Sequence, residues 1–373
     1  MEQNLLERNI VEFVTIFISI LYEALPFIVL GAVIAGMLEE LVPQRLVARI
    51  IPRSKILAIA IGGFLGLLFP MCECGIIPVM RRMLRKGVPL SSCVCYMLAG
   101  PIINVVVMLS TYVAFSGTDT TITAPASPPG ASAKANPAKQ ATSSPAEKPD
   151  EQYSAAGPTQ KVAQIGGLGM TALRMLLGYL VAFGTALVVE WQYKKHGNRL
   201  LTPLATPSTL PLVNDDEDNG ASRRSWFQRI GTISETALHD FVDITVFLIL
   251  GAVLAALSRL FLSHEQMQNL ALGYPGLAIL IFMGLAILLC ICSEADAFIA
   301  ASFRMVPPAP KLAFLVLGPM LDLKLYMMYT RVFRPRLIWT IISCVVVQVL
   351  LYSLLVHFLW SNYVHLLGGS AAA

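Results

Sequence analysis

The feature that most constrains the fold is a pattern that occurs twice along the chain, at an offset of 218 residues from Cys72 to Cys290. In each copy a Cys-X-Cys pair is followed by a Gly-Pro pair and then by a polar residue, and the copies span 72–104 and 290–322. Such self-similarity indicates an internal duplication. The chain is therefore expected to contain two units with the same fold.

Composition places both units in a membrane. The 373 residues are 56% hydrophobic and only 13% charged, and apolar runs long enough to cross a bilayer recur along them. Basic residues gather at the ends of these runs, which is a topology signal and predicts no nucleic-acid partner. The run from Ile10 to Met37 is too long for a signal peptide, so we expect it to remain as the first span. The sequence predicts an all-α, multi-pass integral membrane protein surrounded by lipid.

Shifts in composition divide the chain into six parts. We expect a first membrane repeat (1–115), a disordered linker rich in Ala, Pro and Ser (116–162), a helix that completes the first repeat (163–192), a polar loop (193–228), a second membrane repeat (229–360) and a tail (361–373).

Two apolar segments, 56–87 and 275–303, are interrupted by their cysteine pairs. If both are re-entrant or broken-helix hairpins, six crossings remain and most Lys and Arg residues share one side of the membrane, as the positive-inside rule prefers. Three crossings in each unit then make the units inverted copies, which is a common transporter architecture. Eight crossings with a parallel duplication are the alternative.

The two interruptions carry soft ligands. Gly and Pro near the first cysteine pair favour an irregular turn over 71–75, on which both thiols can face one ion, and the second turn is expected over 290–296. Thiolates suit Cu(I), Zn(II) and similar ions. Inversion would bring the pairs together, and the alternative is that the cysteines are small core residues. The predicted ligands of a transported metal ion are Cys72, Cys74, Cys290 and Cys292.

Charged residues beside the interruptions are further candidates for binding the substrate and exchanging protons. Glu73, Glu294 and Asp296 would add negative charge to the site. In addition, Glu23 and Asp243 occupy matched positions near the middle of two spans, which predicts a proton-coupling pair.

Two polar residues follow the Gly-Pro pairs. Asn104 and Asp322 each lie four residues after the matched glycine, where a polar side chain either completes an ion site or caps the broken helix. Lys324 either neutralises Asp322 or extends to the membrane surface. The remaining cysteines, at 93, 95 and 344, are expected to be packing residues.

At these residues the chain resembles the predicted permease family that includes organoarsenical efflux permeases and copper/zinc efflux transporters. The motifs that carry the resemblance are Cys72–Pro78, the Gly87 turn and Ala99–Asn104. The resemblance covers the membrane part, roughly 10–115 and 163–360.

The second half matches the family less well, because Ser293 stands where the first half has Gly75. Many relatives have a small residue between the two cysteines, whereas this chain has Glu73, which favours a metal cation over a neutral organoarsenical. The resemblance implies export from the cytoplasm across the inner membrane of a bacterium.

Energy for transport is expected from an ion gradient, a partner chain or the substrate's own gradient, because the sequence has no phosphate-binding loop. We therefore predict a secondary permease, not an enzyme, that exports Zn, Cu, Cd or trivalent As by proton-coupled alternating access without a resident cofactor. One alternative is a permease for an organic or other small solute with structural cysteines. Another is a membrane thiol–disulfide oxidoreductase, although Cys-X-Cys closes a tight ring. A homo-oligomer is also left open.

Overall fold

The fold is built from helices, several of them short and interrupted. The computed structural model describes residues 2–41, 52, 54–68, 71–116, 123–124, 160–161, 165–197, 226–260, 275–303 and 306–369. The helices are α1 (Glu2–Leu41), α3 (Lys55–Leu68), α4 (Glu73–Arg85), α5 (Leu90–Ala99), α6 (Val105–Phe115), α7 (Gly167–His196), α9 (Trp226–Leu260), α11 (Pro275–Leu289), α12 (Asp296–Ser302), α13 (Pro308–Leu317), α14 (Leu323–Val332) and α15 (Pro335–Gly369). Two antiparallel strands of two residues each, β1 (Thr123–Ala124) and β2 (Gln160–Lys161), pair with each other.

Three of the described helices are long and apolar enough to cross a membrane, through Ile10–Met37 in α1, Gly167–Lys195 in α7 and Pro335–Asn362 in α15. Helix α9 carries a shorter apolar stretch, Thr245–Leu254. Large apolar side chains are exposed along these helices, as expected for surfaces that face lipid. The fold is that of an all-α membrane protein, while the number of crossings stays a prediction.

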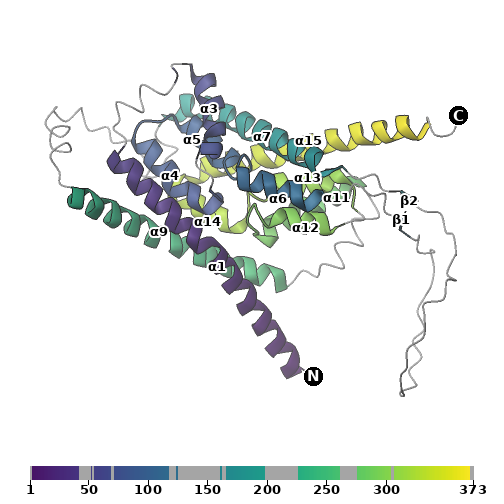
Figure 1. Ribbon diagram of the computed structural model, residues 1–373, viewed down its shortest axis with the longest axis horizontal. Coiled ribbons are helices and arrows are strands. Elements are labelled where there is room, and N and C mark those ends of the chain that lie inside the picture. The colour runs from purple at the N-terminus through teal and green to yellow at the C-terminus, as the bar shows by residue number, and fades with distance from the viewer. Residues whose placement is uncertain are drawn as a thin grey trace.

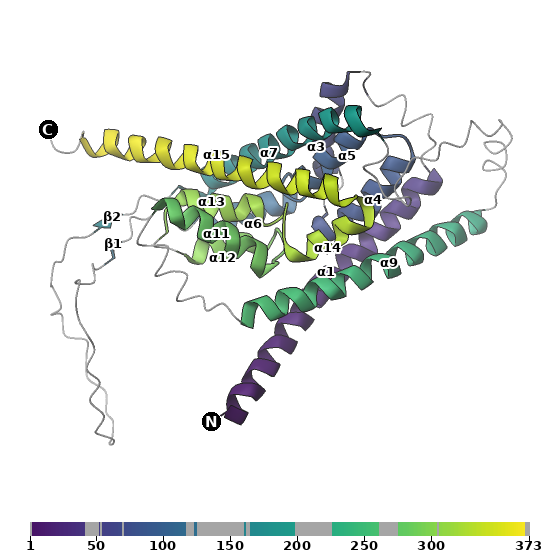
Figure 2. The ribbon, with the colours of Figure 1, turned by 180° about the vertical axis from the view of Figure 1, so that it is seen from behind.

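The long helices enclose the interrupted ones. Helices α1 and α9 lie side by side along one flank, and α7 and α15 cross on the other, with α4, α6, α12 and α14 between them (Figures 1 and 2). Small residues on α1, namely Ala24, Ala32 and Ala35, are buried and allow close packing. The interruptions themselves, over 100–104 and 318–322, are buried, so protein covers their free backbone groups.

The Gly-Pro interruptions are confirmed. Helix α5 ends at Ala99 with Gly100 as its C-cap, and α6 begins after Asn104. Helix α13 ends at Leu317 with Gly318 as its C-cap, and α14 begins after Asp322. A proline removes one backbone donor and clashes with the preceding turn, so neither helix continues through its Gly-Pro pair.

Several packing pairs recur between the two halves. Helix α5 packs against α3 and α7, and α13 packs against α11 and α15 in the same order along the chain. Helix α4 packs against α5 as α12 packs against α13, and α3 packs against α7 as α11 packs against α15. This recurrence is what a duplicated fold would produce, although the duplication, its inversion and the two hairpins stay predictions.

Two boundaries differ from the predicted ones. Helix α15 continues to Gly369, so most of the predicted tail is helical, because the apolar helix extends into a polar end without a Gly or Pro break before Gly368. Helix α7 ends at His196, a few residues beyond the predicted end at 192. The predicted linker, apart from residue 116 and the two short strands, and nearly all of the polar loop over 193–228 lie outside the described residues.

Candidate functional site

The first cysteine pair lies at the start of α4. Cys72 is the N-cap residue and has extended backbone angles, φ −74° and ψ 171°, whereas Cys74 already belongs to the first helical turn. The predicted irregular turn through residue 75 is therefore wrong at its end, because the helix resumes at Glu73. An acidic residue at a helix N-terminus is stabilised there by the helix dipole.

Pro78 makes the first turn of α4 unusual. A proline within a helix cannot donate to the carbonyl four residues before it, which here is the carbonyl of Cys74. The thiol of Cys74 is therefore accompanied by a main-chain oxygen that no helix hydrogen bond from residue 78 occupies. Cys74 therefore offers two possible metal ligands, its thiol sulfur and its main-chain oxygen.

The second cysteine pair lies on an irregular loop between α11 and α12, as predicted. Cys290 has a positive φ of 49°, which residues other than glycine adopt only when their surroundings hold them. The amides of Ala295 and Asp296 both donate to the carbonyl of Cys292 at 3.1 Å, and these bonds close the loop before α12 begins.

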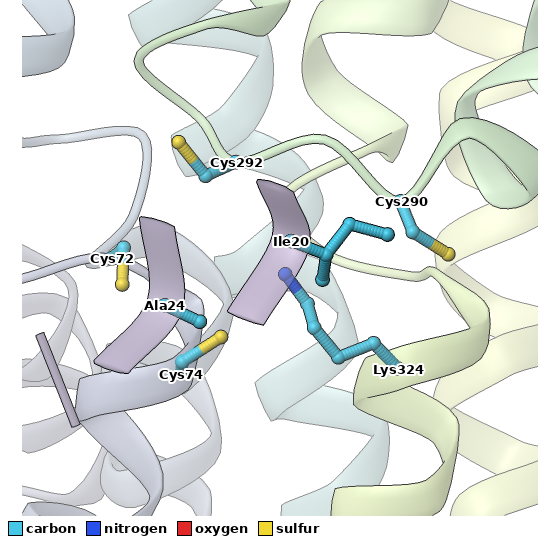
Figure 3. A pocket seen from close by; sticks show the side chains of 7 residues that line it. All are labelled: Ile20, Ala24, Cys72, Cys74, Cys290, Cys292 and Lys324. Atoms are coloured by element: carbon cyan, nitrogen blue, oxygen red, sulfur yellow. The ribbon is translucent and has the colours of Figure 1, made fainter. Parts of the chain in front are cut away.

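All four of these cysteines line one small cavity of about 10 Å³, which is enough room for about one water molecule. Helix α1 covers the cavity with Ile20 and Ala24, and Lys324 of α14 completes its wall (Figure 3). Residues from both halves of the chain therefore meet at this point.

The sulfurs do not converge on a common centre. The side chains of Cys74 and Lys324 point toward one another, while the thiol of Cys290 points away from them (Figure 3). Cys290 donates to the carbonyl of Ile287 at 3.3 Å, and the Cys292 thiol lies 3.1 Å from a carboxylate oxygen of Glu294. Within the described ranges, no three His, Cys, Asp or Glu side chains are grouped closely enough to hold a metal ion.

A buried ion pair adjoins the cavity. The Nζ atom of Lys324 lies 2.9 Å from Oε1 of Glu73 and 3.8 Å from Oδ2 of Asp322, and all three residues are at most 2% exposed. The idea that Lys324 extends to the membrane surface is wrong, because burial between two carboxylates holds its ammonium group inside the fold. Since Lys324 compensates the charge of Glu73, that carboxylate does not by itself favour a cationic substrate.

A second buried ion pair involves Arg174, which the sequence analysis missed. Its guanidinium lies 2.8 Å from Oδ2 of Asp296 and also donates to the carbonyl of Ser293 at 3.1 Å and to Oγ1 of Thr111 at 2.7 Å. The available signal was a single arginine inside the apolar span of α7, since a charge at such a depth usually has a functional partner.

Asn104 and Asp322 cap the broken helices. The Asn104 side chain accepts from the amide of Val106 at 3.0 Å, and the Asp322 side chain accepts from the amide of Leu325. Neither residue lines the cavity. The structure thus realises the capping alternative for both, and Asp322 also approaches Lys324.

The remaining candidates lie elsewhere. Glu23 and Asp243 are on α1 and α9, but their side chains lie outside the described residues, so their predicted proton-coupling role stays a prediction. Cys93 and Cys95 are fully buried on α5 and do not line the cavity.

Comparison with known proteins places the chain among transporters. The family model described as "Predicted permease" matches residues 9–125 and 160–358, which is most of the chain. The chain belongs to this predicted permease family. The permease is 34% identical to "UPF0718 protein YcgR" of Bacillus subtilis over 344 residues, covering 92% of this chain and 96% of that protein.

A second relative comes from Streptococcus mutans. The permease is 29% identical over 354 residues to its "Putative two-component membrane permease complex subunit", covering 95% of this chain and 97% of that protein. No solved structure matches the permease. The family and the relatives' names together support a membrane transporter.

Proposed function

We propose that this permease exports a thiophilic metal ion or metalloid, such as zinc, copper, cadmium or trivalent arsenic, through the cavity lined by its two Cys-X-Cys pairs. The observation that carries the proposal is that Cys72, Cys74, Cys290 and Cys292 line one cavity although they belong to two distant segments. Thiolates are the preferred ligands of such ions. Cysteines that served only as packing residues would not be expected to line one cavity from two distant segments.

The substrate would first meet the pair at α4. Cys74 points into the cavity, and the Cys74 carbonyl receives no bond from Pro78. The thiols of Cys290 and Cys292 would have to rotate before they could bind the substrate, because they now contact Ile287 and Glu294 and not the cavity centre. Transport would thus require the two halves to change their contacts, which suits alternating access.

Thiols must lose their protons to bind a soft ion as thiolates, so metal binding releases protons. Two buried carboxylates near the cavity, Glu73 and Asp296, could receive these protons. Protonation would neutralise the carboxylate and weaken its ion pair with Lys324 or Arg174. This supports proton coupling in the inner membrane of a bacterium. A partner subunit, as the name of the streptococcal relative suggests for that protein, would be compatible with the same site.

The proposal is tested by expressing the permease in a host sensitive to these ions. The wild type should raise tolerance, and Cys72→Ser/Cys74→Ser should abolish the gain. The matched control is Cys93→Ser/Cys95→Ser, a third Cys-X-Cys pair that is equally buried but lies outside the cavity. Equal tolerance in both double variants, at equal membrane levels, would refute the role of the cavity thiols.

A second candidate substrate follows from Lys324. Its ammonium group forms part of the cavity wall, and no metal-binding group of three ligands exists within the described residues. A cation in the wall favours a small organic anion, for which the cysteines would be packing residues. Uptake or efflux of such an anion that survives Cys72→Ser/Cys74→Ser but not Lys324→Met would select this function. A redox-cycling Cys72–Cys74 disulfide, detected by counting free thiols, would instead select the oxidoreductase.

A further inference from the structure

Each cysteine-bearing interruption is joined to the opposite half of the chain by a buried ion pair. Glu73 is the first residue of α4 and pairs with Lys324 of α14, whereas Asp296 is the first residue of α12 and pairs with Arg174 of α7. The two distances, 2.9 Å and 2.8 Å, are nearly equal. The first residues of α4 and α12 are thus each paired with a cation from the other half of the chain.

The two cations differ in what they hold. Lys324 contacts carboxylates of side chains, whereas Arg174 also binds the main chain of the cysteine loop through the carbonyl of Ser293. Ser293 directly follows Cys292, and Asp296 ends the same loop. One guanidinium group therefore spans the loop from the residue after the second cysteine to the start of α12.

Arg174 is itself fixed in place. Its Nη1 donates to Thr111 on α6, and the Thr111 hydroxyl donates to the carbonyl of Val107 at 2.7 Å. Arg174 is 1% exposed and lies on α7, which packs against α5, α6 and α15. The planar fork of arginine can hold several acceptors at once, which a lysine ammonium on a flexible stem cannot do with the same geometry.

The loop depends on such external support. Cys290 adopts a positive φ, and two main-chain bonds to the Cys292 carbonyl close the loop. Strained backbone of this kind persists only when its surroundings determine it. From α7, Arg174 bridges both a main-chain carbonyl of this loop and the side chain of Asp296 that follows it.

We infer that Arg174 is the positioning residue of the second cysteine pair. Its guanidinium holds the loop over 290–295 at the cavity, so the placement of Cys290 and Cys292 depends on how α7 of the first half lies against α12 of the second. A movement of the halves that breaks this contact releases the second pair, and the substrate is thereby bound by different thiols in different transport states. The inference uses the cysteine cavity of the proposed function but does not depend on its substrate.

The test measures the reactivity of the loop thiols in the full-length protein. In a background with serine at 72, 74, 93, 95 and 344, only Cys290 and Cys292 remain, and their rate of maleimide labelling reports how often the loop leaves the cavity. Arg174→Gln should raise that rate by roughly tenfold or more, because hydrogen bonds from a charged group to the loop are lost. Arg174→Lys should give an intermediate rate, since it keeps the charge but not the fork.

Two controls separate positioning from general stability. In a complementary background that retains only Cys72 and Cys74, Arg174→Gln should leave their labelling rate unchanged. Arg174→Gln/Asp296→Asn removes both charges, so its thermal midpoint should return toward that of the parent while the labelling of Cys290 and Cys292 stays fast, because the bond to the Ser293 carbonyl is still altered.

The inference is overturned if folded Arg174→Lys and Arg174→Gln/Asp296→Asn label at the parent rate, or if both cysteine pairs become reactive in parallel. These two variants decide the matter even if Arg174→Gln does not fold. Because no substrate is added, a failure of this test leaves the export proposal standing, and a failure of the metal-tolerance test leaves the inference standing if the Arg174 variants label faster than the parent.

Discussion

Lys324 on α14 lies 2.9 Å from Glu73 at the start of α4, although 251 residues separate them along the chain. Both side chains are almost fully buried. Removing one partner of such a pair leaves an uncompensated charge in a medium of low dielectric constant, whereas removing both leaves none. The pair therefore contributes to the stability of the fold, and its lysine also lines the cavity.

We predict that Lys324→Met lowers the free energy of unfolding by about 3–5 kcal/mol, and that Glu73→Gln/Lys324→Met recovers a large part of the loss. The measurement is thermal or denaturant unfolding of the purified protein in detergent. Lys55→Met is the matched control, because Lys55 also pairs with a glutamate, Glu190 at 2.7 Å, but is 59% exposed, so its loss should cost about 1 kcal/mol or less. Equal losses for both lysine variants would contradict the account.

Helix α1 contacts α4 at a point where there is no room for a side chain. A Cβ atom on Gly31 would collide with the carbonyl oxygen of Gly75, and one on Gly251 of α9 would lie 2.7 Å from Cα of Lys324. Gly31→Ala and Gly251→Ala should therefore each destabilise the protein by about 1–3 kcal/mol, through overpacking against backbone.

The matched control is Gly284→Ala on α11, where a Cβ would meet nothing within 4 Å. This change should be neutral or stabilising by up to about 1 kcal/mol, because alanine has a higher helix propensity than glycine. Unfolding midpoints of the three variants test the prediction. It fails if Gly284→Ala is as harmful as Gly31→Ala.

Ala24 of α1 is buried in the cavity wall, whereas Val29 on the same helix is 47% exposed. A cavity of about 10 Å³ cannot admit an aromatic ring. Ala24→Phe should therefore abolish the gain in metal tolerance, either by filling the site or by holding α1 away from it, while Val29→Phe should have little effect. Tolerance at matched membrane levels is the readout, and a fully active Ala24→Phe would show that the substrate does not pass this point.

Asn104 caps α6 through its side-chain oxygen. Asn104→Ser should retain the cap without adding a charge and keep stability within about 0.5 kcal/mol, whereas Asn104→Ala should lose about 1 kcal/mol. If Asn104 only caps the helix, transport should follow this order of stability. Loss of transport in a stable Asn104→Ser would instead restore its predicted role in binding the substrate.

Several features of the site could be predicted from the sequence because they depend on local chemistry. Gly100 and Gly318 precede prolines that stop a helix, and cysteines at matched positions of a duplication are expected to occupy related places. The location of Cys290 on an irregular loop follows from the same reasoning. The resumption of α4 at Glu73 could not be foreseen as readily, because a favourable acidic residue at a helix start competes with Gly75 and Pro78 as helix breakers.

The long-range pairs could not be predicted. Nothing in the sequence near Arg174 says which face of α7 it occupies, and the residues that it meets, Ser293 and Asp296, lie more than one hundred positions away. The same holds for Lys324, which could neutralise Asp322 or reach the surface, and which the fold instead places beside Glu73. Such partners are determined by how helices pack and not by local sequence.

The most direct test of the central claim is the metal content of the purified protein after incubation with zinc, copper(I), cadmium or trivalent arsenic and removal of the free ion. The wild type and Cys93→Ser/Cys95→Ser should retain one of these ions, and Cys72→Ser/Cys74→Ser should lose it while remaining folded. Equal retention by all three proteins, or by none of them, would contradict the assignment of the four-cysteine cavity as the site of a soft ion.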